Sequence, residues 1–169
     1  MLNLEKNKFV IMITQIKGRL IEKSPTEVVV DCNGIGYSIN ISLNTFSKIG
    51  NEENIKLYTY LIIKEDSHSL YGFFDKSERS LFKLLISVSG VGASTGRMML
   101  SSLSPNEIVS AIMTENVQVI QSIKGIGLKT SQRVILELKD KVLSLDGSEK
   151  QELTLNKESN EAAFALEVL

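Results

Sequence analysis

A nine-residue pattern that occurs twice in the second half of the chain constrains the fold more than any other feature. Residues 87–95 have the sequence SVSGVGAST, and residues 122–130 have the sequence SIKGIGLKT. The serine, both glycines and the threonine coincide, and Val91 corresponds to Ile126. Each copy follows one segment with the apolar spacing of a helix and begins another. The repeat therefore predicts two helix–turn–helix hairpins of the same geometry.

The residue types in this pattern suit the binding of an anion. Glycine permits positive φ and lets another backbone approach closely, because it has no Cβ. The apolar residue between the glycines can pack between the two helices and fix their angle. The helix that follows presents unpaired N–H groups and the positive end of its dipole, which bind an anion such as a phosphate. Phosphate contacts carry no base information, so we expect sequence-independent binding to a nucleic-acid backbone.

The residues that we expect to contact DNA lie in the two turns and directly after them. Lys129 and Arg133 are four residues apart on one face of the last helix and can both reach phosphates. One such turn is often only a tight connection between helices, whereas two copies in register favour DNA binding. The expected contacts are Gly90, Val91, Gly92, Ser94 and Thr95 in the first copy, and Gly125, Ile126, Gly127, Lys129, Thr130 and Arg133 in the second. A separate apolar stripe is expected to face the core: Leu128, Ile135, Leu138 and Val142.

The first half of the chain has the pattern of a small β-barrel. Short β-branched or aromatic runs predict strands at residues 16–21, 27–31, 37–41, 55–63 and 69–74. Turn clusters such as Asn33-Gly34 separate several of them. Five short strands fit the OB-type barrel that often binds nucleic acids, although strand number alone leaves an SH3-like barrel open.

After Asp75 the pattern becomes helical, so the fold class is α+β with segregated domains. Apolar spacing predicts a helix after residue 76 and further helices at about 93–102, 105–114, 116–122 and 128–143. Ser104, Pro105 and Glu107 form a capping-box sequence. Residues 144–160 are polar and acidic and predict a flexible linker, and residues 161–169 resemble the start of a third helical domain. Residues 1–11 resemble an N-terminal extension before Met12.

The distribution of charge is compatible with this interpretation. The formal net charge is -1, yet residues 75–142 contain nine basic and six acidic residues, whereas residues 143–169 contain two and six. A basic central segment permits a nucleic-acid partner. No apolar run approaches the ~20 residues of a membrane span. The single cysteine, Cys32, cannot form a disulfide within the chain, so we expect the protein to be in the reducing cytoplasm. With His68 as the only histidine, we expect no metal site and no cofactor.

Competing phosphate-binding motifs fail on spacing. A Walker A loop requires glycine immediately before its lysine, and Leu128 stands there before Lys129. Residues 90–96 are one residue too long for the dinucleotide fingerprint. A DNA glycosylase with a helix-hairpin-helix would need an aspartate farther along than Asp140. A general OB-type single-strand binder would need stacking aromatics, which total only 6% here. Both remain as alternatives.

Together with these hairpins, four further segments resemble the RuvA family, whose members bind Holliday junctions in the bacterial branch-migration complex. The segments are MITQIKGRLIEK (residues 12–23), NGIGY (33–37), KEDSHSLYGF (64–73) and ERSLFKLLISVSGVG (78–92). The resemblance implies an OB-fold tetramerisation and junction domain at residues 12–74 and a double helix-hairpin-helix domain at 75–143. It also implies a non-catalytic role in recombination and DNA repair.

The resemblance also implies partners. A homotetramer, or an octamer of two tetramers face to face, would hold a four-way junction flat while the RuvB ATPase pumps DNA, and the RuvC resolvase would be a further partner. Residues 161–169 would be the truncated start of the RuvB-binding domain, so we expect the 169-residue form to bind junctions but to fail to recruit or stimulate RuvB. Glu65 and Asp66 match the acidic pin of the family, although such a pair is usually only a solvated loop tip. Ser94 and Leu128 depart from lysines common in the family.

Overall fold

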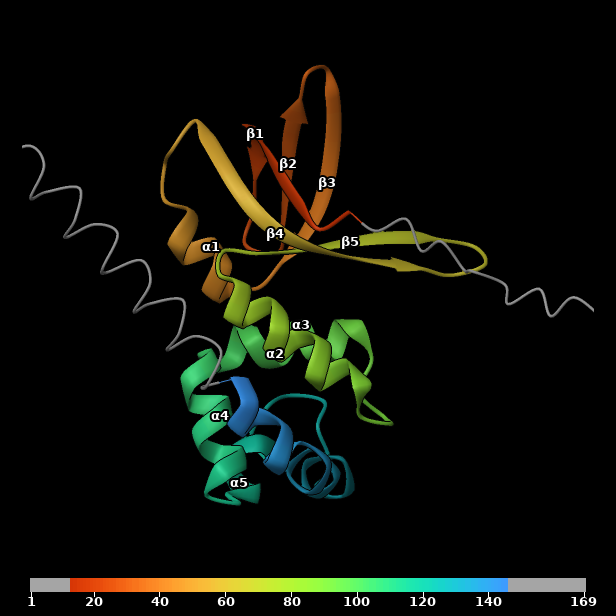
Figure 1. The fold of residues 1–169 in the computed structure, drawn as a ribbon, viewed down its shortest axis with the longest axis vertical. Helices are drawn as coiled ribbons and strands as arrows, with labels where there is room; N and C mark the ends of the chain where they lie inside the picture. The colour runs from red at the N-terminus through yellow and green to blue at the C-terminus, as the bar shows by residue number, and fades with distance from the viewer. Residues whose placement is uncertain (1–12, 146–169) are drawn as a thin grey trace, which may run out of the picture.

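The computed structural model describes residues 13–145. It consists of a closed β-barrel followed by a bundle of short helices. The barrel lies above the helices in Figure 1. The expected α+β fold with an OB-type barrel and a helix-hairpin-helix domain is therefore confirmed. The expected extension at residues 1–11, most of the linker at 144–160 and the third domain at 161–169 lie outside the described residues.

The barrel contains β1 (Gln15–Lys23), β2 (Glu27–Cys32), β3 (Ile35–Ile41), β4 (Asn54–Ile63) and β5 (His68–Phe73) in the order β1-β2-β3-β5-β4. Neighbouring strands are antiparallel except β3 and β5, which pair in parallel, and β4 pairs with β1 to close the barrel. Alternate residues point inward, so Val28 and Val30 of β2 and Ile39 and Ile41 of β3 fill the barrel core.

The barrel contains one element that the strand pattern did not predict. Helix α1 (Leu43–Ile49) connects β3 to β4. The Ser42 hydroxyl caps it by accepting a hydrogen bond from the Thr45 N–H at 3.0 Å, as serine commonly does at a helix N-terminus. A helix of seven residues is too short to show clear apolar periodicity. The strand and helix patterns of the sequence therefore gave no indication of it.

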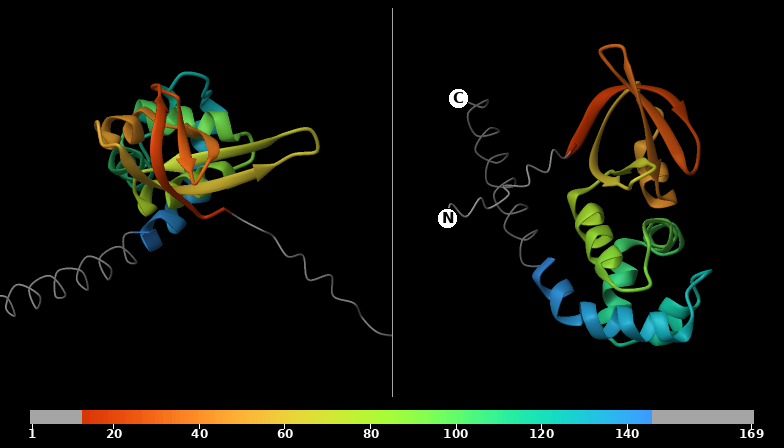
Figure 2. Two further views of the ribbon diagram at one scale, coloured as in Figure 1. Left: turned by 90° about the horizontal axis from the view of Figure 1, so that it is seen from above. Right: turned by 90° about the vertical axis from the view of Figure 1, so that its right-hand side faces the viewer.

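The helical domain contains α2 (Lys76–Ser87), α3 (Ala93–Ser102), α4 (Pro105–Met113) and α5 (Val117–Gln121). A final helix covers residues 128–145 within the described part of the chain. The predicted capping box is present at α4, because the Ser104 hydroxyl and the Glu107 carboxylate each accept from the other residue's backbone N–H. The final helix lies at the end of the molecule farthest from the barrel (Figure 2).

The barrel has its own apolar core, and two aromatic residues of β5 join the separate core of the helical domain. Tyr71 and Phe73 of β5 are buried against Phe82 of α2, with ring centroids 5.2 and 4.9 Å from it. Aromatic pairs at such distances add stability beyond the area that they bury. The two parts therefore form one packed body, and the barrel fixes the direction of α2.

Polar contacts hold the same interface. The buried carboxylate of Glu78, in the first turn of α2, accepts hydrogen bonds from the hydroxyls of Ser42 (2.5 Å) and Thr45 (2.7 Å) at the start of α1. The Arg97 guanidinium of α3 reaches the carbonyls of Thr26 and Ile41 at 3.4 and 3.3 Å. Buried polar groups are tolerated when they are hydrogen-bonded in this way. The first hairpin is thus attached directly to the barrel.

Candidate nucleic-acid interface

The two glycine-containing turns have the same backbone geometry. In the first, between α2 and α3, the Val91 N–H donates to the Val88 carbonyl at 3.0 Å, and the Gly96 N–H donates to the Gly92 carbonyl at 2.8 Å. In the second, Ile126 donates to Ile123 at 3.1 Å and Ser131 donates to Gly127 at 3.0 Å. These are corresponding positions of the repeat. The sequence repeat is therefore also a structural repeat.

The apolar residues of the repeat hold each hairpin closed. Val91 and Ile126, between the paired glycines, are each only 5% exposed, and both belong to the core of the helical domain. Val88 and Ile123, which precede the turns, are buried beside them. Val91 and Ile126 therefore stabilise the turns from inside, as the sequence pattern predicted. Their buried side chains cannot themselves present a surface to DNA.

The two glycines of each turn have different roles. Gly90 and Gly125 have φ of 94° and 86°, a conformation that side chains rarely adopt. Gly92 has an ordinary φ of -84°, and Gly127 is also outside the positive-φ region. A Cβ at Gly92 or Gly127 would meet nothing within 4 Å. The first glycine of each turn therefore provides the positive φ, and the second, which lacks a side chain, leaves the surface open before the following helix.

The two hairpins lie side by side, and Arg133 connects them. Its Nη1 donates to the carbonyl of Ser89 in the first turn at 3.0 Å, although the two residues are far apart in sequence. A Cβ at Gly90 would lie 3.9 Å from the Thr130 hydroxyl and 4.0 Å from Arg133 Nη1. The sequence indicated Arg133 as a phosphate contact and gave no sign of this bond. The guanidinium therefore lies between the two turns.

The polar residues of the repeat lie at the surface. Ser94 and Lys129, at corresponding positions in the first turn of each following helix, are exposed, whereas Thr95 and Thr130 are half-buried. Lys124, inside the second turn, is also exposed and was missed, because the comparison of the two copies emphasised shared residues. Leu128 is 50% exposed, so its expected place in the core stripe was wrong; Ile135, Leu138 and Val142 are buried as expected.

Glu65 and Asp66 occupy the tip of the β4–β5 hairpin. This hairpin extends well beyond the barrel, on the side toward which the α2–α3 turn also points in Figure 1. The tip is closed by a hydrogen bond from the Lys64 N–H to the Ser67 carbonyl at 2.8 Å. Both carboxylate residues are exposed. The two acidic side chains are therefore presented at the end of a two-stranded antiparallel arm.

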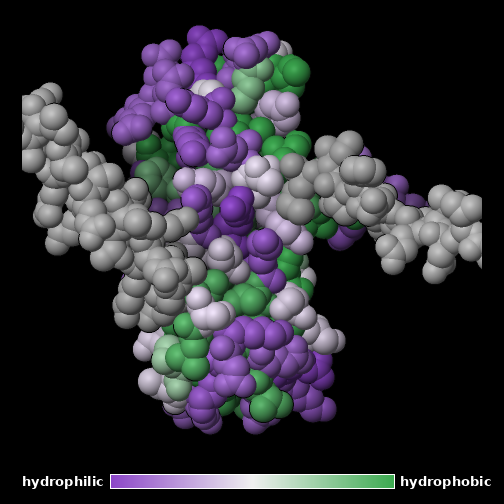
Figure 3. Space-filling view, viewed as in Figure 1, coloured by the Kyte–Doolittle hydropathy of each residue, from purple (hydrophilic) through white to green (hydrophobic). Residues whose placement is uncertain are grey.

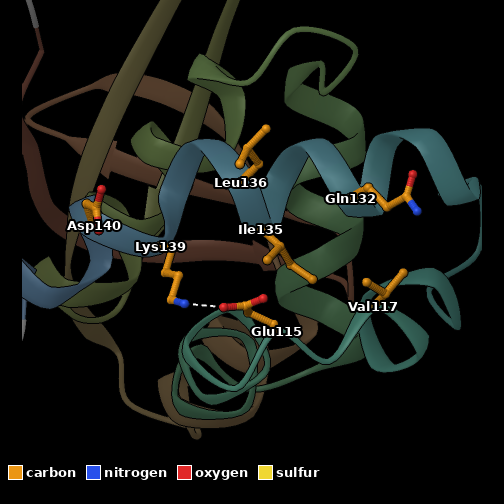
Figure 4. A pocket seen from close by; sticks show the side chains of 7 residues that line it. All are labelled: Glu115, Val117, Gln132, Ile135, Leu136, Lys139 and Asp140. Atoms are coloured by element: carbon orange, nitrogen blue, oxygen red, sulfur yellow. Dashed lines mark hydrogen bonds and ion pairs between the residues drawn. The ribbon is translucent and has the colours of Figure 1, made fainter.

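A groove of about 510 Å³ lies between α5 and the final helix, but it differs from a base-binding pocket. It is lined by Val117, Ile135 and Leu136, and the Lys139–Glu115 ion pair lies across it (Figure 4). Asp140 lies on the same helix as Lys129, as the sequence indicated. Lys139 lowers the pKa of Glu115 through a hydrogen bond and its charge. An ion-paired groove is a poor pocket for a flipped base, which needs stacking surfaces.

The comparisons with known proteins match the two parts separately. The RuvA N terminal domain model matches residues 12–72, and the SAM-like helix-hairpin-helix tandem model matches residues 82–140. The first match covers the barrel, and the second covers both hairpins. A protein of Christiangramia forsetii named Holliday junction branch migration complex subunit RuvA is 62% identical over 161 residues, covering 94% of this chain and 82% of the relative. The chain belongs to the RuvA family.

Other relatives of the same name support this assignment. The protein of Flavobacterium psychrophilum is 57% identical over 159 residues, with 94% of this chain and 82% of the relative covered. A Bacteroides fragilis protein is 59% identical over 131 residues, with 78% and 65% covered. The similarity thus extends over both the barrel and the helical domain of the RuvA family.

Within the described residues, no helix is both long enough and apolar enough to cross a bilayer.

Proposed function

We propose that this chain binds four-way DNA junctions without sequence specificity, as the non-catalytic DNA-binding subunit of a branch-migration complex. The observation that carries the proposal is the pair of matched turns, in which the Cβ position of Gly92 and of Gly127 opens onto free space. A phosphate can approach the backbone N–H groups of the following helix there. The proposed contacts are the surface residues of both turns and helix starts, with Arg133 between them.

The proposed assembly is a homotetramer, or an octamer of two tetramers, in the cytoplasm. Four copies of the β4–β5 arm would bring eight carboxylates of Glu65 and Asp66 to the centre of the junction. Such a concentration of charge repels phosphates and keeps the strands apart. The proposed domain roles are junction and subunit contacts for residues 12–74 and backbone binding for residues 75–143. RuvB, as the ATPase motor, and RuvC are the proposed protein partners.

A competition experiment tests the proposal. Labelled four-way junction bound to the protein is challenged with unlabelled junction, duplex or single strand of equal length and varied sequence. We expect junction to compete best and base sequence to have little effect. Equal competition by single strand would favour the OB-type binder instead. Strand loss at damaged bases, after treatment that cleaves abasic sites, would favour the glycosylase.

The acidic arm has its own test. Glu65→Gln combined with Asp66→Asn removes both charges and keeps similar side-chain shapes. If repulsion sets the preference for junctions, the double variant binds plain duplex several-fold more tightly, and selectivity for the four-way junction falls. The measurement is made at low salt, where charge effects are largest. Unchanged affinity for both DNA forms would mean that Glu65 and Asp66 are only a solvated tip.

A further inference from the structure

Arg133 makes two contacts that a simple phosphate-binding side chain would not need. Its Nη1 donates to the Ser89 carbonyl of the first turn at 3.0 Å. Its Nε lies 4.0 Å from Oε1 of Glu137, one turn farther along the final helix. The guanidinium is therefore held both by its own helix and by the other hairpin.

Burial does not explain the position of this side chain. The side chains of Arg133 and Glu137 are 49% and 39% exposed. Figure 3 shows hydrophilic residues gathered over the lower end of the helical domain, where Figure 1 shows the final helix. A long exposed side chain samples many rotamers, so fixing it costs conformational entropy. Each polar contact is weak at an exposed site, but both restrain the same planar guanidinium.

The contact between the hairpins exists in one direction only. In the repeat, Met98 corresponds to Arg133, and Lys124 corresponds to Ser89. A methionine side chain has no hydrogen-bond donor, so the reciprocal bond from the first hairpin to the Lys124 carbonyl cannot form. The second hairpin alone therefore supplies this side-chain bond between the copies.

The bond is made at the part of the first turn that matters for an approaching phosphate. Ser89 directly precedes Gly90, whose φ is 94°, and Gly92, two residues later, opens onto free space. A Cβ at Gly90 would lie 3.9 Å from the Thr130 hydroxyl and 4.0 Å from Arg133 Nη1, so the two hairpins approach each other closely here. A bond to the Ser89 carbonyl therefore restrains the first turn relative to the second.

We propose that Arg133, oriented by Glu137, is a positioning residue that ties the two hairpins together and sets the spacing at which their turns meet the DNA backbone. This inference rests on the proposed junction binding. The bond to Ser89 uses only one of the guanidinium N–H donors, so others can donate to a phosphate at the same time. Two turns already held at the bound spacing bind more tightly, because less freedom is lost on binding.

Glu137 provides the sharpest test, because charge and positioning predict effects of opposite sign. If only charge matters, removing a carboxylate near bound phosphates strengthens DNA binding. If Glu137 orients Arg133, Glu137→Gln should instead weaken junction binding roughly 2- to 10-fold, the range expected for ordering one long side chain. Asp140→Asn is the matched control and should leave affinity equal or slightly higher. Asp140 carries the same charge on the same helix but lines the groove beside Leu136 (Figure 4).

Variants of Arg133 separate its two roles. In an Arg133→Gln background no guanidinium remains to be oriented, so Glu137→Gln should no longer weaken binding. Arg133→Lys keeps the charge but loses the planar fork. Its slope of log affinity against log salt should therefore equal that of the wild type, while its affinity falls by a factor similar to that of Glu137→Gln. A side chain that only contacted a phosphate could be replaced by lysine with little loss.

Hydrogen exchange tests the link without DNA. The Val91 amide, bonded to the Val88 carbonyl, reports on the first turn, and the Ile126 amide, bonded to the Ile123 carbonyl, reports on the second. In Arg133→Gln the Val91 amide should exchange several-fold faster than in the wild type, because local opening becomes easier. The Ile126 amide should keep its rate and serves as the internal reference.

Three outcomes would overturn the inference. Tighter junction binding by Glu137→Gln would show that Glu137 acts only through its charge. Equal weakening by Glu137→Gln with and without Arg133 would show that it does not act through the guanidinium. Unchanged exchange at Val91, or equal acceleration at both turns, would show that no specific link reaches the first turn. Failure of the wild type to prefer junctions, with the exchange difference present, would instead contradict the proposed function and leave the link between the hairpins in place.

Discussion

The two hairpins share one backbone geometry but differ in the residues that surround it. The second hairpin has three basic residues at and after its turn, Lys124, Lys129 and Arg133. The corresponding positions of the first hairpin are uncharged: Ser89, Ser94 and Met98. The first hairpin is instead attached to the barrel through Arg97, whose counterpart in the second is the exposed Gln132. The barrel positions the first hairpin, whereas the second has the basic residues at and directly after its turn.

Arg133 reduces this difference. Because its guanidinium donates to the Ser89 carbonyl at 3.0 Å, a cation of the second hairpin lies at the turn of the first. A phosphate bound at the first turn would therefore meet a positive charge that the turn residues 88–95 do not themselves supply. Both copies of the repeat thus keep the backbone geometry on which the proposed phosphate binding depends, while the basic residues and the attachment to the barrel are divided between the copies.

The largest expected loss of junction affinity comes from placing a side chain at the second glycine of a turn, where the surface is open. Gly127→Val and Gly92→Val each add a side chain where a Cβ meets nothing within 4 Å, so the fold should tolerate both. A lost hydrogen bond to a charged group costs about 1.5–3 kcal/mol, or roughly 10- to 150-fold in junction affinity. Gly127→Val should weaken binding more, because the lysines surround that turn.

The control for this pair is Gly36→Val in β3, where a Cβ would meet only Val29 at an ordinary 3.6 Å. It changes an exposed barrel glycine in the same way, and it should leave junction binding unchanged. Binding by titration and folding by thermal melting are measured for all three variants. If both hairpin variants fold and bind normally, the turns are only connections between helices.

The next effect is smaller and concerns the charge difference itself. Lys129→Ser should reduce the salt dependence of binding by about 1 per engaged site, and Ser94→Lys should increase it by a similar amount. The double swap moves the charge from one hairpin to the other and should restore nearly the wild-type slope. A slope that follows Lys129 alone, with no response to Ser94→Lys, would show that the first hairpin is not at the DNA backbone.

Much of this arrangement could be predicted from the sequence. The strands, the helices of the bundle and the Ser104 capping box were predicted within a few residues, because alternation, helical spacing and capping are local signals. The repeat itself identified both turns. The Gly-apolar-Gly motif could be interpreted from the sequence alone, because the positive φ of its first glycine and the packing of its apolar residue are local properties.

What the sequence did not predict depends on contacts between distant residues. The bond from Arg133 to Ser89 and the exposure of Leu128 both follow from how the second hairpin lies against the first. The role of Glu78, buried under the hydroxyls of Ser42 and Thr45, requires the barrel and α2 to be in place. Periodicity describes which face of a helix is apolar, but not which partner covers it.

A third prediction concerns packing behind the turns, where the hairpins differ by one residue. Gly96 of α3 corresponds to the buried Ser131 of the final helix. A Cβ at Gly96 would lie 3.1 Å from Ile86 Cγ2 and 3.3 Å from Phe82 Cε2. Gly96→Ser should therefore destabilise the fold by about 1 kcal/mol, because overpacking exceeds the gain in helix propensity.

That change corresponds to a fall of about 3 °C in melting temperature. The reciprocal change, Ser131→Gly, should cost only about 0.5 kcal/mol, mainly through helix propensity. Both are measured by thermal melting, with circular dichroism to follow helix content. A rise in melting temperature for Gly96→Ser would show that α2 and α3 can move apart without cost, and that Gly96 is not required for the close packing of α3 against Phe82 and Ile86.

The smallest effect concerns an ion pair of the second hairpin, which has no counterpart of the Arg97 contact with the barrel. Glu115, just before α5, pairs with Lys139 of the final helix. The hydrogen bond and charge of Lys139 lower the pKa of Glu115 from 4.5, and Glu115 raises the pKa of Lys139 from 10.5 in the same way. The contribution of Glu115 is thus present above pH 4.5 and is lost as the pH falls through its lowered pKa. That of Lys139 is present below pH 10.5 and is lost as the pH rises through its raised pKa.

Lys139→Gln should therefore lower the melting temperature slightly at pH 7 and low salt. The difference should shrink as the pH falls through the lowered pKa of Glu115, and in high salt, because exposed pairs are weak and screened. Glu115 also has a positive φ of 54°, which disfavours a side chain. Glu115→Gly removes the same pair but relieves this backbone conformation, so its melting temperature should exceed that of Lys139→Gln at pH 7. Equal melting temperatures for the two variants would mean that the backbone of Glu115 is unstrained. An effect of Lys139→Gln that is equally large in high salt, where the ion pair is screened, would mean that Lys139 acts through packing in the groove beside Leu136, and not through its charge.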